Sequence, residues 1–108
     1  MKMQQDLVFS ESGRELTAQL WCEIDHHTAR RIRERIDEKI FLLRPEVLTI
    51  DFLGVRFMDS SGIGLILGRV EIAGAVGATV RIKGLSPTLT KLVRLSGVDR
   101  VAGLTIMK

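Results

Sequence analysis

The feature that most constrains the fold is the stretch of residues 47–69, which passes from a buried strand through a polar turn into a long helix. Residues 47–52 combine β-branched and large apolar side chains over the length typical of a buried strand. At Asp59, Ser60 and Ser61 the side chains become short hydrogen-bond acceptors, which suit the unpaired N–H groups of a helix start. We therefore predict that a helix begins here.

This second helix carries two rows of apolar side chains. One row follows the 3.6-residue period of a buried helix face and comprises Ile63, Ile66, Leu67, Val70 and Ala73. A second row on the opposite side comprises Leu65, Ile72 and Val76, with Arg69 among them. Two interpretations remain open for the second row: a flanking element covers it, or it binds a partner beside the serines.

The chain before this stretch predicts a hairpin followed by a helix. Residues 7–9 form a short strand, 11–14 a turn, and 16–24 a strand with strict alternation of apolar and polar side chains. Trp21 falls on the polar face, where we favour shielding of a sheet edge over a binding role. Asp25 or its neighbours cap the next helix, which Pro45 terminates.

The first helix separates apolar from charged side chains. Its apolar face comprises Ala29, Ile32, Ile36, Ile40 and Leu43. Its outer side carries Arg30, Arg31, Arg33 and Arg35 together with Asp37, Glu38 and Lys39. The arginines are compatible with an acidic partner or nucleic acid, but a solvated helix face is the commoner explanation and the one we favour.

The remaining segments complete an α/β fold. Residues 79–82 predict a strand, and a third helix starts at Ser86 and Pro87, buries Leu89, Leu92 and Val93, and ends at Gly97. Residues 101–107 allow one last strand. The order β-β-α-β-α-β-α predicts a mixed sheet of four to five strands with packed helices. The turns at Asp25 and Asp59 then meet at the sheet edge where ligands and partners usually dock.

Composition limits the class of protein. With 108 residues, of which 45% are apolar, the chain predicts one domain spanning residues 1–108. A lone cysteine, Cys22, and the lack of a membrane-spanning run or a leader segment favour a cytoplasmic protein that does not contact membranes. A net charge of +3 and only five aromatic residues, four Phe and one Trp, argue against direct binding of nucleic acid.

Three kinds of enzyme site are conceivable, and none is favoured. Ser60, His27 and Asp25 provide the residue types of a hydrolase, but the serine lacks the Gly-x-Ser-x-Gly elbow. Gly62, Gly64 and Gly68 are spaced one residue too widely for a dinucleotide loop. His26 and His27 point in different directions on a helix and lack a third metal ligand. We therefore expect no catalytic residue, no cofactor and no metal.

Two motifs resemble a known family. Residues 23–29 (Glu-Ile-Asp-His-His-Thr-Ala) and 57–69 (Phe-Met-Asp-Ser-Ser-Gly-Ile-Gly-Leu-Ile-Leu-Gly-Arg) are similar to the two signature stretches of the anti-sigma factor antagonists, which are single STAS domains. The similarity is greatest to the members that act on the sporulation anti-sigma F factor, and it extends from about Leu7 to Val101. Cys22 departs from the pattern, since the family usually has glycine there, and this departure puts the local strand geometry in question.

The resemblance implies a regulatory binding protein and not an enzyme. It implies that Ser60 is phosphorylated by a partner that is both an anti-sigma factor and a serine kinase. The unphosphorylated form would bind that partner and release the sigma factor, and a serine phosphatase would reset the cycle. We expect a monomer whose partner-binding residues are Asp25, Asp59, Ser61, Gly62, Leu65, Arg69 and Ile72. The alternative is a STAS-domain regulator of another pathway, either a stress-response antagonist or a scaffold subunit of a signalling assembly.

Overall fold

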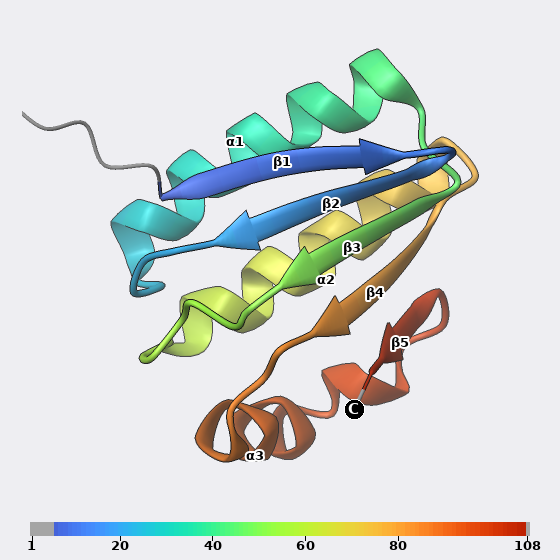
Figure 1. Cartoon of the computed structure of the whole chain (residues 1–108). Helices are drawn as coiled ribbons and strands as arrows, with labels where there is room; N and C mark the ends of the chain where they lie inside the picture. Colours follow the sequence, from blue (N-terminus) through green and yellow to red (C-terminus); the bar gives the residue numbers. More distant parts are fainter. Residues whose placement is uncertain (1–5, 108) are drawn as a thin grey trace, which may run out of the picture.

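A five-stranded mixed sheet forms the centre of the molecule, which we describe from a computed structural model over residues 6–107 (Figure 1). The strands lie in chain order, with β1 antiparallel to β2 and the other neighbours parallel. The elements are β1 (Leu7–Ser12), β2 (Glu15–Leu20), α1 (His26–Leu43), β3 (Val47–Asp51), α2 (Ser60–Ala75), β4 (Thr79–Lys83), α3 (Pro87–Ser96), a 3₁₀ turn (Val98–Arg100) and β5 (Leu104–Ile106). The predicted α/β fold is confirmed.

Helices α1 and α2 pack side by side on one face of the sheet, which places the core between them and the strands (Figure 1). Alternate strand residues point into this core, because successive side chains of a strand face opposite ways. They are Leu16, Ala18, Leu20, Leu48, Ile50, Val80 and Ile82, which meet Ile32, Ile36, Ile40, Ile66 and Ala73 of the helices. Within residues 6–107, no helix is long and apolar enough to cross a bilayer.

The hairpin differs in its boundaries from the prediction. Strand β1 continues to Ser12, and Gly13 forms the turn with a left-handed backbone at φ 60°. Strand β2 ends at Leu20 instead of residue 24. The Trp21 N–H still donates to the Asp6 carbonyl at 2.8 Å, but residues 21–23 leave the ladder. The irregular segment therefore begins beside Cys22, where the sequence departs from the family pattern.

The buried face of α2 is a correction to the prediction. Leu65 and Arg69, expected as partner contacts, are only 3% and 2% exposed, because α1 packs over them. Leu67, expected in the core, is 41% exposed. The buried residues of α2 are Gly62, Leu65, Ile66, Arg69 and Ala73. A flanking helix thus covers this side of α2 and leaves Leu65 and Arg69 almost no exposed surface.

Candidate functional site

The turns that carry the two motifs meet at one edge of the sheet. Strands β2 and β3 are parallel neighbours, so α1 and α2 both begin at the same end of the molecule (Figure 1). A parallel bridge joins Ile24 to Met58 beyond the strands. The Ile24 N–H donates to the Phe57 carbonyl at 3.0 Å, and the Asp59 N–H donates to the Ile24 carbonyl at 3.1 Å. The predicted meeting of the two turns is confirmed.

Asp25 holds the first turn as the N-cap of α1. Its Oδ1 accepts hydrogen bonds from the backbone N–H groups of His27 at 2.9 Å and Thr28 at 3.0 Å. Thr28 completes a reciprocal capping box, because its hydroxyl oxygen accepts the Asp25 N–H at 2.9 Å. The backbone hydrogen bond from Thr28 is the main cause that lowers the pKa of the Asp25 carboxyl. Asp25 is therefore a carboxylate fixed in position by the helix it caps.

Asp59 is the N-cap of α2 and thereby fixes the position of Ser60, the next residue. The Asp59 Oδ1 accepts the Ser61 N–H at 2.8 Å. Ser60 is the first residue of the helix and is exposed, whereas Ser61 is half-buried. The two serines therefore differ in accessibility, and the first presents its hydroxyl to solvent at a helix start.

Gly62 allows the first turn of α2 to pack against Met58 of the preceding loop. A Cβ atom at this position would lie 2.2 Å from both Cγ and Sδ of Met58, whose side chain is buried. Gly62 is itself buried, and its place in the site is set by packing against Met58. By contrast, a Cβ at Gly64 would have no neighbour within 4 Å.

Three large apolar side chains are exposed on the loops of this edge. Trp21 follows β2 and is 46% exposed, while Leu53 and Phe57 lie between β3 and α2 and are 73% and 53% exposed. The Trp21 ring packs over Gly54, where an added Cβ would meet Cε3 at 2.5 Å. Trp21 thus shields the loop after β3, and the three residues together form what we call the apolar rim. The sequence indicated only Trp21, because loop residues follow no period that marks exposure.

Arg69 serves the packing of the two helices. Its Nε lies 2.8 Å from Asp37 Oδ1, and an Nη atom donates to Asp37 Oδ2 at 3.1 Å. Burial lowers the pKa of Arg69 and raises that of Asp37, and each charge opposes the effect on the other. Ile72, the remaining expected contact on this helix, is half-buried and packs against the core.

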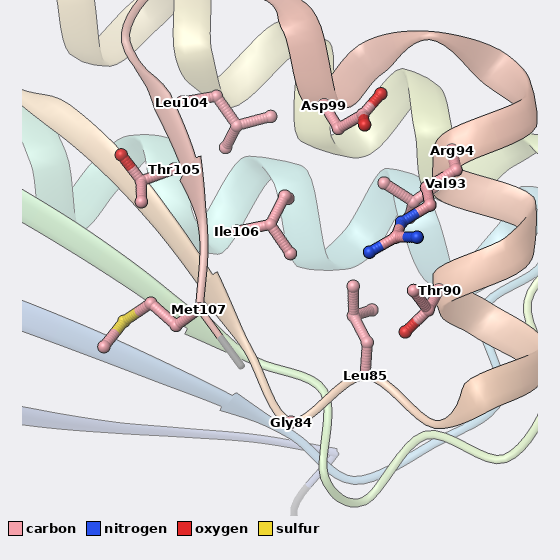
Figure 2. Close-up of a pocket in the computed structure, with 10 residues that line it drawn as sticks. All are labelled: Gly84, Leu85, Thr90, Val93, Arg94, Asp99, Leu104, Thr105, Ile106 and Met107. Carbon is pink, nitrogen blue, oxygen red and sulfur yellow. The ribbon is translucent and has the colours of Figure 1, made fainter.

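Two of the surface cavities lie near different helices. One, of about 420 Å³, lies between the first turns of α1 and α2 and is lined by His26, Ala29, Arg30, Arg33, Ser61, Gly64 and Leu65. The other, of about 780 Å³, lies between α3 and β5 (Figure 2). There the Arg94 guanidinium extends toward Ile106 and Leu85. Only the first cavity includes residues of the two motifs.

The geometry gives no support to the hydrolase alternative. Among the hydrogen bonds of residues 6–107, none joins Ser60 to His27, and the Asp25 carboxylate is used in the capping box. Within the same residues, no three His, Cys, Asp or Glu side chains gather as they would around a metal ion. What the site does offer is an exposed hydroxyl on a rigid support, beside an apolar rim.

Comparison with known proteins gives consistent matches. Residues 10–107 match the STAS domain family. An anti-sigma F factor antagonist of Lysinibacillus sphaericus is 35% identical over 117 aligned positions, which cover 96% of this chain and 97% of the relative. The structure of the anti-sigma factor antagonist SpoIIAA in its unphosphorylated form has a TM-score of 0.79 at 30% identity and covers 94% of this chain and 88% of its own. The phosphorylated form of SpoIIAA from Bacillus matches at a TM-score of 0.70 and 30% identity over 94% and 91% of the two chains.

Proposed function

The chain belongs to the STAS domain family, and we propose that it is an anti-sigma factor antagonist whose binding is switched by phosphorylation of Ser60. In its unphosphorylated form it binds an anti-sigma factor that is also a serine kinase, and this binding releases the sigma factor. Once phosphorylated, it no longer binds, until a serine phosphatase removes the phosphate. The chain itself is a substrate and a binding partner, not an enzyme.

The exposure of Ser60 is the observation that carries this proposal. A kinase must bring the serine hydroxyl into line with the γ-phosphate of ATP, so the hydroxyl has to project from the surface. Ser60 meets this requirement at the first position of α2, with Asp59 fixing the helix start behind it. The similarity to a protein whose structure is known in phosphorylated and unphosphorylated forms supports the same role.

The apolar rim supports the docking part of the proposal. Exposed aromatic side chains on loops at the carboxyl edge of a sheet are typical of protein interfaces, where tryptophan is among the residues that contribute most. Trp21, Leu53 and Phe57 lie on the loops that lead to Asp25, Asp59 and the helix start at Ser60. Asp25 and Asp59, both half-buried caps, would present fixed carboxylates beside the rim.

Electrostatics explain how phosphorylation would block binding. A phosphoserine adds a charge of about −1.5 to −2. A like charge brought within about 4 Å at an interface costs on the order of 4 kcal/mol at an effective dielectric constant near 20. Because each 1.4 kcal/mol is tenfold in affinity, binding would weaken roughly a thousandfold. The fold itself should change little, since the helix dipole attracts the phosphate while Asp59 repels it.

The test is to incubate the chain with ATP and each anti-sigma factor encoded in the genome that encodes this chain, and to map the phosphate by mass spectrometry. We expect phosphate on Ser60 in the wild type and on Ser61→Ala, and none on Ser60→Ala. Phosphate confined to another residue, or no phosphorylation by any of these proteins, would contradict the proposal. The identity of the reactive kinase also decides between the sporulation pathway and a stress-response pathway.

A further inference from the structure

The cavity between α1 and α2 is a groove next to the helix start at Ser60 and Ser61. The proposed function assigns no role to it. The buried residues Ala29 of α1 and Leu65 of α2 form its floor, and the exposed Gly64 and the half-buried Ser61 also line it. Gly64 leaves it open, because no atom lies within 4 Å of a Cβ placed there. We call this feature the interhelical groove.

The walls of the interhelical groove carry donors and positive charge. His26, Arg30 and Arg33 all line it from α1, at the i, i+4 and i+7 positions of one helix face. No acidic residue is among those that line it. Three N–H groups at the two helix starts, those of His27, Thr28 and Ser61, are already bonded to Asp25 and Asp59, so the side chains supply most of the recognition chemistry of the groove.

Nearby acids offset this charge only in part. The Glu34 Oε2 atom lies 3.9 Å from Arg30 Nε, but both side chains are well exposed. Such an exposed ion pair contributes little free energy. Asp37 is within electrostatic range of Arg33, yet its two oxygens are engaged by Arg69. Within residues 6–107, Arg33 has no ion-pair partner inside 4.0 Å. Its guanidinium is therefore available to an incoming carboxylate.

We propose that the interhelical groove receives an acidic segment of the anti-sigma factor, whose carboxylates pair with Arg30 and Arg33 while the apolar rim contacts the same protein. This inference rests on the proposed function and adds the charge and the position of one contact. Charge complementarity argues for the occupant, since guanidinium groups bind carboxylates through paired hydrogen bonds. A floor of small and apolar residues suits the stem of a Glu or Asp side chain.

Two double variants with the same change in net charge separate this inference from general electrostatic attraction. Arg30→Glu with Arg33→Glu reverses the groove. Arg35→Glu with Lys39→Glu makes the same change on the other side of α1, where both cations lie over the Phe9 ring at 5.8 and 5.4 Å. Circular dichroism and thermal melting of both variants confirm that each is folded before binding is measured.

The measurement is the Kd for the anti-sigma factor that phosphorylates the chain, at low and high salt. We expect the groove variant to bind at least tenfold more weakly at low salt, with a salt dependence that is reduced or reversed because salt screens the new repulsion, while the affinity of the control variant changes less than threefold. Equal losses in both variants, or no loss in either, would overturn the inference and leave the proposed function intact. If the wild type binds no anti-sigma factor, the proposed function fails and the inference fails with it.

A neutral variant tests occupation of the groove without altering charge. Gly64→Leu places a side chain in the open space above the floor, and a leucine also favours the helix more than glycine does. We expect a melting temperature at or above that of the wild type and binding at least fivefold weaker. Unchanged affinity in this folded variant would show that nothing enters the groove.

Discussion

The guanidinium of Arg69 meets the carboxylate of Asp37 through two contacts, at 2.8 and 3.1 Å, and so joins α2 to α1 inside the molecule. Arg69 is 2% exposed, which places a full positive charge in the interior next to a half-buried carboxylate. The pair is compatible with only one rotation of α2, because only one helix face can place residue 69 opposite residue 37. This rotation turns Ser60 outward and buries Leu65.

Asp37→Asn should destabilise the fold by about 3 kcal/mol, since it leaves the Arg69 charge buried without a counter-ion. The double variant Asp37→Leu with Arg69→Met should recover most of that loss, because apolar side chains of similar volume replace a desolvated ion pair at little cost. Urea unfolding of both variants gives the comparison. A double variant as unstable as the single one would mean that packing, and not the unpaired charge, dominates.

Gly62 and Gly64 should respond in opposite directions to the same substitution. Gly62→Ala forces a methyl group against the buried Met58 side chain and should lower the free energy of unfolding by about 1–3 kcal/mol. Gly64→Ala meets open space and should raise it by about 0.5–1 kcal/mol through helix propensity. Thermal or urea unfolding measures both. Similar effects at the two positions would contradict the close packing described for Met58.

Asp59 should show its capping role in the difference between two substitutions. Asp59→Ala removes the acceptor for the Ser61 N–H and should cost about 1 kcal/mol of unfolding free energy. Asp59→Asn keeps an acceptor of the same shape and should cost much less. Urea unfolding of the two variants provides the measurement. Equal losses would assign the stabilisation to the negative charge instead of the hydrogen bond.

Asp25 should make the free energy of unfolding depend on pH in the acidic range. Its pKa is lowered in the folded state, mainly by the Thr28 backbone hydrogen bond, so its contribution is present above the ordinary pKa of an aspartate and is lost as the pH falls through the lowered value. The stability difference between wild type and Asp25→Asn should therefore be constant near neutral pH and shrink as the pH falls from the ordinary pKa of an aspartate through the lowered one. Urea unfolding across that range checks it. A difference that grows on acidification would have the wrong sign.

Local sequence patterns were sufficient for the elements and their caps. Ser86 is an N-cap as predicted, Asp25 and Asp59 are the caps within the short segments where helix starts were predicted, and Gly97 ends α3 in a left-handed conformation. Such features depend on the chemistry of a few neighbouring residues, which the sequence displays directly. The meeting of the two motif turns also followed from strand order, because parallel neighbours share an edge.

The rotation of α2 about its axis could not be predicted from local sequence patterns. Apolar side chains occupy both sides of this helix, so its periodicity could not decide whether Leu65 or Leu67 faces the core. The contact between Arg69 and Asp37 fits only the observed rotation, but these residues lie on different helices 32 positions apart, so no local pattern displays it. The groove walls were likewise visible only as a run of arginines, whose position beside Ser61 depends on how α1 packs against α2.

The affinity of the chain for its anti-sigma factor, with and without phosphate on Ser60, tests the proposed switch most directly. Calorimetry of the purified wild type, of the same chain phosphorylated on Ser60, and of Ser60→Ala provides the three Kd values. We expect Ser60→Ala to bind like the unmodified wild type, and the phosphorylated chain to bind roughly a thousandfold more weakly. A phosphorylated chain that binds as tightly as the unmodified one would contradict the account.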